Sequence, residues 1–218
     1  MPPAPLPPSA PAALPGMAAA RPIMTIPEAI DRYNREPELV SSPALREVIN
    51  DMIDRNIKTE FDNDSYPDAV TLTDIMFRRS IHNIRILTGP QGDGFLKLLR
   101  DSFVGALARI KENGGKIKVI VLNHPNKCLD ELQKIYPETL EVIPAQSSIL
   151  VKHFTVCDSR MARMEEVHDV IDDNTPITAI KARVCFNDPT QAKCLEDTFD
   201  QIWNRLKQIL EKTAPEIR

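Results

Sequence analysis

The chain has 218 residues, of which 42% are hydrophobic and 27% are charged, a size and balance that suit one ordinary α/β domain with a tail. The formal net charge of −4 gives no general attraction to nucleic acid, so such binding would need a local basic patch. No apolar run approaches the roughly 18 residues that cross a bilayer, so we predict no membrane span. The four cysteines lack C-x-x-C spacing, which indicates reduced thiols in a cytoplasmic protein.

Residues 1–40 are predicted to form a disordered tail rich in proline and alanine. Nine of the 19 prolines fall within the first 27 residues, and such a segment can neither pair its backbone nor bury a core. The tail is either an unstructured extension or a linker or ligand for a proline-reading partner protein. Its apolar residues lack a basic region before them, which argues against a signal peptide. Met17 or Met24 is an alternative start of the chain.

The folded domain is predicted to span residues 41–213. Two amphipathic helices open it, at 41–56 and 67–79, because apolar residues recur there at helical spacing. Strands and helices then alternate, and the chain closes with consecutive strands and a last helix. We expect strands at 84–88, 117–122, 140–145, 150–158 and 177–186, and helices at 95–112, 126–136 and from 189 onward. This order predicts an α/β fold with a mixed β-sheet flanked by helices on its faces.

The strand predicted at 150–158 carries two polar residues that are unusual on a core-like segment. His153 lies in its middle and Asp158 at its end. A buried strand histidine that bonds an aspartate is a common structural arrangement. The alternative is that the two residues belong to a catalytic or binding site. The charged residues that follow are either a solvated loop or the polar rim of that site; they are Arg160, Arg163, Glu165, Glu166 and His168.

The sequence predicts no metal site and no cofactor. His82 and His124 have no neighbouring set of ligands, and the spacing of His153 and Cys157 on one strand keeps them too far apart to share an ion. The loop at 89–94 lacks the glycine and lysine pattern of a phosphate loop. Its backbone amides and the helix after it still have the chemistry to hold an anion.

From about residue 68 to 207, the layout resembles the phospholipase D-like superfamily. The strand, helix and strand within 84–122 resemble the opening unit of that family, and 177–203 resembles its closing strand and helix. The stretch 153–158 is similar to the core of the family's H-x-K-x-x-x-x-D motif. The resemblance implies a single-unit phospholipase D-like domain.

Alignment of the motif on Asp158 shows how this chain departs from the family. His153 then occupies the place of the lysine, and Val151 that of the nucleophilic histidine. Valine cannot attack phosphorus. The Gly-Ser-x-Asn element, which helps to hold phosphate in the family, is replaced by residues 163–168. The resemblance therefore implies a degenerate motif.

Two functional hypotheses follow, beside a plain α/β interaction domain. The first is a catalytically degenerate domain that binds, senses or scaffolds a phosphate-containing anion or nucleic acid through His153, Arg160 and Arg163. The resemblance implies a homodimer for it, since single-unit members pair across a two-fold axis. The second is an active phosphodiesterase or nuclease with altered chemistry, in which a histidine is nucleophile or base and Glu165 or Glu166 is the acid. The candidate catalytic residues are His153, Asp158, Glu166 and His168.

Overall fold

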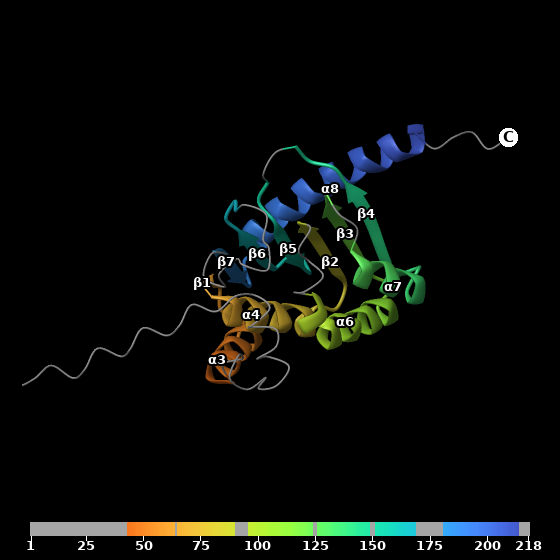
Figure 1. The fold of residues 1–218 in the computed structure, drawn as a ribbon. Helices are drawn as coiled ribbons and strands as arrows, with labels where there is room; N and C mark the ends of the chain where they lie inside the picture. The colour runs from red at the N-terminus through yellow and green to blue at the C-terminus, as the bar shows by residue number, and fades with distance from the viewer. Residues whose placement is uncertain are drawn as a thin grey trace, which may run out of the picture.

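The computed structural model describes residues 43–63, 65–89, 96–123, 126–148, 151–168 and 181–213. The predicted tail, His124 and most of the loop at 89–94 lie outside these residues. Within them, a seven-stranded sheet forms the centre, with α3, α4, α6 and α7 on one face and α8 on the other (Figure 1). This arrangement confirms the predicted α/β class with a mixed sheet between layers of helices.

The helices and strands have these bounds. The helices are α3 (Pro43–Asp54), α4 (Tyr66–Arg79), α6 (Arg100–Glu112), α7 (Lys127–Ile135) and α8 (Pro189–Thr213). The strands are β1 (Thr59–Asn63), β2 (Asn83–Thr88), β3 (Lys116–Leu122), β4 (Leu140–Ala145), β5 (Phe154–Cys157), β6 (Met161–Glu165) and β7 (Ala182–Phe186).

The order of strands across the sheet decides which chain segments meet. The order is β1-β7-β6-β5-β2-β3-β4. β2, β3 and β4 run parallel, whereas every other neighbouring pair is antiparallel. The carboxyl ends of β1, β2, β3, β4 and β6 therefore share one edge with the amino ends of β5 and β7. We call this the carboxyl edge and the opposite one the amino edge.

Two hydrophobic cores hold the helices to the sheet. Alternate residues of a strand point to opposite faces, so Ile86 packs with α4, α6 and α7 while Leu87 packs with α8. On the α8 face, the rings of Phe199 and Trp203 stack at 5.6 Å and are almost fully buried. Burial of each such side chain contributes about 1.5–3 kcal/mol, which anchors α8 across the middle of the sheet. None of the helices in the described part of the chain is both long and apolar enough to span a membrane.

Two strands differ from the sequence prediction. The sequence predicts no strand between the two opening helices, where β1 lies, and predicts a solvated loop or the polar rim of a site where β6 lies. β1 is an edge strand that pairs only with β7, so much of it is exposed and it lacks an apolar run. β6 lies inside the sheet between β5 and β7, although it carries Arg163 and Glu165. The strand predicted at 150–158 is also shorter: β5 begins only at Phe154, so His153 lies just before it.

Candidate functional site

His153 and three side chains from the charged region after it meet at the carboxyl edge. His153 precedes β5, Arg163 and Glu165 belong to β6, and His168 follows β6. The carbonyl of His153 accepts the Glu165 N–H at 2.8 Å, which extends the β5–β6 pairing by one step. We call these four residues the His–Glu cluster.

Glu165 lies at the centre of the His–Glu cluster. Its Oε2 is 3.2 Å from Nδ1 of His153 and 3.2 Å from Nε2 of His168. The two imidazole rings meet edge to face, with centroids 5.2 Å apart. The guanidinium of Arg163 donates to the other oxygen, Oε1, and its Nε donates to Oδ1 of Asn63 at 3.2 Å. Both carboxylate oxygens are therefore bonded inside the cluster.

The side chains of the cluster are mostly buried, and the carboxylate at its centre is negatively charged. The side chain of Arg163 is 6% exposed, and those of His168, Glu165 and His153 are 15%, 16% and 19% exposed. Burial raises the pKa of Glu165, but the charge of Arg163 and the hydrogen bonds from the cluster outweigh it and hold that pKa well below its usual value. Because Glu165 is ionised and can only accept, the nitrogens that face it carry hydrogen. His153 is thereby held with Nδ1–H toward Glu165.

The other side of the His153 ring lies against Gly89, directly after β2. A Cβ atom at residue 89 would lie 2.5 Å from Cε1 and 2.9 Å from Nε2 of His153, closer than such atoms approach. A side chain at residue 89 would have to displace the ring, whose Cε1 is the nearest atom, and this contact lies at the carboxyl end of a parallel strand. In open α/β sheets, ligands bind outside this end of the strands.

Asp158, which the sequence offered together with His153 as a pair or as parts of one site, lies at the amino edge instead. Its carboxylate accepts the backbone N–H groups of Ile81, His82 and Asn83 at 2.7, 2.9 and 2.8 Å. It follows β5 directly, whereas His153 precedes β5. The structure thus separates the two residues by the length of the strand and uses Asp158 to organise the start of β2.

The remaining predicted residues lie outside the His–Glu cluster. Arg160 lies beside Asp158 in the turn between β5 and β6, where its carbonyl accepts the N–H of Asp188. The side chain of Glu166 is 62% exposed and pairs with Lys152. Val151, which the alignment puts in the place of the nucleophile, packs against the core under α8. Of the candidate residues, His153, Arg163 and His168 come together.

Sequence reasoning left the central place of Glu165 unnoticed, along with the contributions of Asn63 and Gly89. The sequence does contain a signal for the role of Glu165, because Arg163 and Glu165 fall on one face of a strand and His168 follows Glu165 by three residues. Asn63 had none, because it reaches the cluster through the pairing of β1 with β7.

The His–Glu cluster also contains the ligand types of a metal site, although the sequence predicted none. One donor atom each from His153, Glu165 and His168 lies within 4.8 Å of the others. Two imidazoles and a carboxylate are a ligand set that proteins use for zinc.

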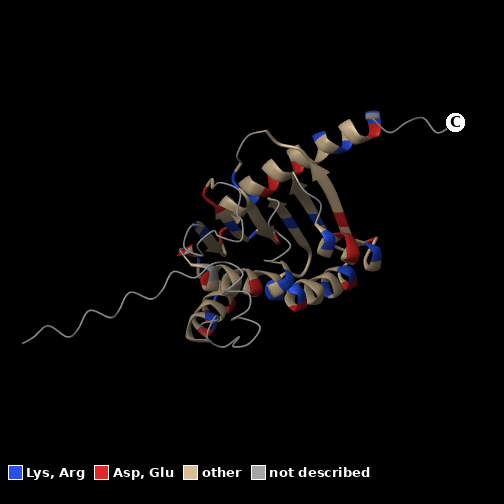
Figure 2. Cartoon of the chain, viewed as in Figure 1, with Lys and Arg blue, Asp and Glu red and all other residues tan. Residues whose placement is uncertain are grey.

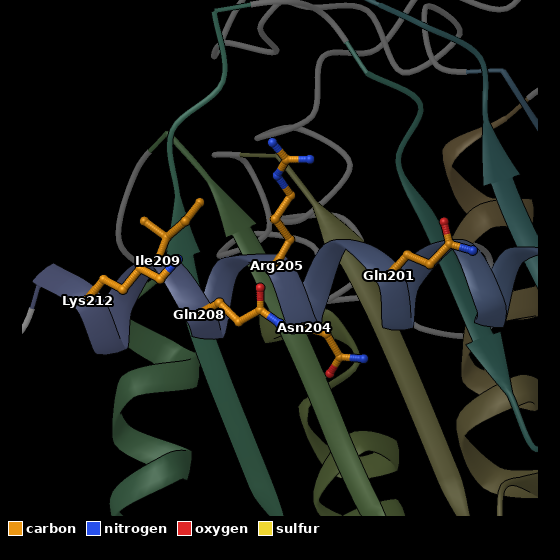
Figure 3. Close-up of a pocket in the computed structure, with 6 residues that line it drawn as sticks. All are labelled: Gln201, Asn204, Arg205, Gln208, Ile209 and Lys212. Atoms are coloured by element: carbon orange, nitrogen blue, oxygen red, sulfur yellow. The ribbon is translucent and has the colours of Figure 1, made fainter.

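A shallow hollow along α8 is a weaker candidate. Figure 3 shows the side chains that line it, all from this one helix: Gln201, Asn204, Arg205, Gln208, Ile209 and Lys212. It is open, it is lined mostly by polar residues, and no residue of the His–Glu cluster borders it. We assign no site there.

Comparison with known proteins gives likenesses of fold. No protein-family profile and no curated protein sequence matches the chain. TrmBL2, described as an archaeal chromatin protein with a novel mode of DNA binding, is similar over 80% of this chain, with 15% identity and a TM-score of 0.50. This chain spans only 64% of the length of TrmBL2.

Two further solved structures resemble the chain over most of their own length. Nuc from Salmonella typhimurium, a phospholipase D family member, matches 67% of this chain and 95% of its own at 12% identity and a TM-score of 0.46. NucT from Helicobacter pylori matches 67% and 96% at 13% identity and a TM-score of 0.47. Of these two, Nuc is described as a member of the family that the sequence resembles, and the likeness concerns the fold alone.

Proposed function

We propose that this chain is a phospholipase D-like domain that binds a phosphate-containing ligand, nucleic acid above all, without cleaving it. The observation that carries the proposal is the setting of His153. Its Nδ1 is held by Glu165, and its ring lies beside Gly89 at the carboxyl edge. An Nε2–H that donates to a phosphate oxygen forms a charge-assisted hydrogen bond, and glycine allows the backbone to approach a ligand closely.

Glu165 and Arg163 act behind His153. Glu165 fixes the orientation of the imidazole through Oε2, and Arg163 holds Glu165 in place by donating to Oε1. We had expected Arg163 and Arg160 to contact the ligand directly. The guanidinium of Arg163 is nearly buried and bonds within the cluster, so we propose a positioning role for it. Arg160 lies at the amino edge and has no part in the proposed site.

The absence of cleavage rests on Val151. The alignment with the phospholipase D motif gives this residue the place of the nucleophile, and its side chain packs against the α8 core. An apolar side chain provides neither a nucleophile nor a proton acceptor. Binding without hydrolysis is the expected result.

Nucleic acid is the ligand class we favour. TrmBL2, which has a similar fold, is described as binding DNA. Basic and acidic residues are mixed on the helices of this chain (Figure 2), so affinity must come from a local site rather than from a broad basic surface. A homodimer, implied by the family resemblance, would give such a module two sites. It predicts a mass in solution of twice 24.5 kDa by light scattering.

Fluorescence anisotropy with labelled single-stranded and duplex oligonucleotides tests the proposal, with inorganic phosphate as competitor. His153→Ala removes one charge-assisted hydrogen bond of about 1.5–3 kcal/mol, so the affinity should fall by about 10- to 100-fold. The matched control is His82→Ala, an exposed histidine before β2, which should bind as the wild type does. No binding by the wild type to either oligonucleotide, or equal binding by His153→Ala, contradicts the proposal.

One observation favours the alternative of an active phosphodiesterase. When Glu165 holds Nδ1–H, a neutral His153 presents a lone pair on Nε2, which is the form that a nucleophile or general base requires. Incubation of the same oligonucleotides and a phosphodiester dye, with and without divalent metal, separates the two functions. Turnover that is lost in His153→Ala and kept in His82→Ala would show that the chain is an active phosphodiesterase and would refute binding without cleavage.

A further inference from the structure

We propose that Nδ1 of His153, Oε2 of Glu165 and Nε2 of His168 bind one divalent transition-metal ion of the zinc class. The three atoms come from two strand ends and the segment after β6. They converge at the carboxyl edge, where each N···O distance is 3.2 Å and all three atoms lie within 4.8 Å of one another.

These distances are near those of a tetrahedral site. Zinc lies about 2.0–2.2 Å from nitrogen and carboxylate ligands, so neighbouring ligand atoms are about 3.3–3.5 Å apart. The two N···O distances already match. The two ring nitrogens have to approach each other by at most about 1.5 Å. His168 lies outside the strands, so its ring can make this adjustment without disturbing the sheet.

The chemistry of the ligands selects the class of ion. Two imidazoles with one carboxylate suit zinc, cobalt, nickel or iron, whereas magnesium and calcium prefer oxygen ligands throughout. Three protein ligands leave a fourth position open, as in zinc sites that bind a water or substrate.

The surroundings of the carboxylate also fit a metal ligand. Ligating carboxylates are commonly held by an outer hydrogen bond, and Arg163 provides one on Oε1 while Asn63 in turn holds Arg163. The positive charge of Arg163 opposes the ion, but Oε1 of Glu165 already engages it. The open position of a divalent ion takes a negatively charged oxygen, so its ligand class is the one proposed above, a phosphate oxygen.

Metal binding would also define the state of His153. An ion on Nδ1 replaces the hydrogen there and leaves the remaining ring hydrogen on Nε2. His153 would then be a hydrogen-bond donor toward the phosphate. In this second step the inference rests on the proposed function, whereas the metal site itself does not.

Titration of the EDTA-treated full chain with Zn²⁺ by calorimetry, and with Co²⁺ by visible absorption, tests the site. We expect one ion per chain, a rise in melting temperature with Zn²⁺, and d–d bands from Co²⁺. His153→Ala and His168→Ala should each weaken binding at least about tenfold. The controls His82→Ala and Cys194→Ser, which alter exposed potential ligands elsewhere, should bind as the wild type does.

Three results overturn the metal site. They are no stoichiometric binding by the wild type, binding by folded His168→Ala equal to that of the wild type, and loss of binding in either control. Circular dichroism establishes that each variant is folded. His168→Ala is the safer of the two cluster variants, because it leaves His153 against Gly89 in place.

Oligonucleotide affinity with EDTA and with Zn²⁺ distinguishes the two proposals. Zn²⁺ should strengthen binding by the wild type and have no such effect on His168→Ala. Zinc binding without any oligonucleotide binding refutes the proposed function and leaves the metal site. Oligonucleotide binding that depends on His153, in a chain that binds no zinc, refutes the metal site and leaves the function.

Discussion

Replacement of Asp158 tests whether this residue of the motif-like stretch serves the fold rather than the site. Asp158→Ala removes the acceptor for three backbone N–H groups, at 2.7, 2.9 and 2.8 Å. Each such bond has a net value of about 1 kcal/mol where water can replace it. Asp158 also has φ of +50°, which costs alanine about 1 kcal/mol more. We expect Asp158→Ala to lower the free energy of unfolding by about 3–5 kcal/mol.

Asp158→Asn separates the contributions. Asparagine tolerates positive φ and keeps one oxygen for the N–H groups of His82 and Asn83, so only the bond from Ile81 is lost. The expected loss is about 1–2 kcal/mol. As a control, Asp62→Ala removes a carboxylate that is 76% exposed and lies 3.8 Å from Nε of Arg183, and should change stability by less than about 0.5 kcal/mol.

Urea unfolding followed by fluorescence measures these losses, since the single tryptophan, Trp203 of α8, is buried between that helix and the sheet. Binding of oligonucleotide by folded Asp158→Asn should equal that of the wild type. The reasoning is refuted if Asp158→Ala unfolds within about 0.5 kcal/mol of the wild type. It is also refuted if the asparagine variant loses as much stability as the alanine variant.

Two other predictions follow from the structure. In Gly89→Ala, the new Cβ atom 2.5 Å from the His153 ring must displace that ring, so oligonucleotide affinity should fall about as far as in His153→Ala. The matched control is Gly105→Ala, whose Cβ would meet only a side-chain atom at 3.4 Å. Unchanged affinity in Gly89→Ala would contradict the placement of the ring. Alkylation of the native protein near pH 8 should modify Cys194 alone, because the other three thiols are buried and burial raises the pKa of Cys157 to about 12. Mass spectrometry should find one label per chain and none in Cys194→Ser, and a second label in the native protein would show that a buried thiol is accessible.

The fold was predictable where burial leaves a continuous pattern. The apolar run at 117–122 indicated a central strand, and β3 does lie between two parallel neighbours in the sheet. β6 was missed for the opposite reason. Arg163 and Glu165 can lie inside the sheet because they neutralise each other beside Asn63. In the sequence alone, their charges are indistinguishable from those of a solvated loop.

The site was predictable in its residues but not in its partnerships. The sequence shows His153 as a polar residue on a core-like segment and offers Asp158, on the same predicted strand, as one possible partner. Strand residues rise about 3.3 Å each, so five residues separate side chains by about 16 Å. The actual partner comes from the next strand, because the pairing of Phe154 with Met164 continues to His153 and Glu165. Recognition of the hairpin would have revealed it.

The central position of Glu165 sets the terms for any function of this edge. Its carboxylate already occupies the place between two imidazoles and a guanidinium that an external anion would otherwise take. Arg163 is therefore used internally, and a phosphate can be attracted only by the outer nitrogen of His153 or by an ion held between His153, Glu165 and His168. Both kinds of attraction depend on the imidazole of His153, the first on Nε2 and the second on Nδ1. Under the proposed function, one ring nitrogen of His153 would bind inward, to Glu165 or an ion, while the other would bind the ligand.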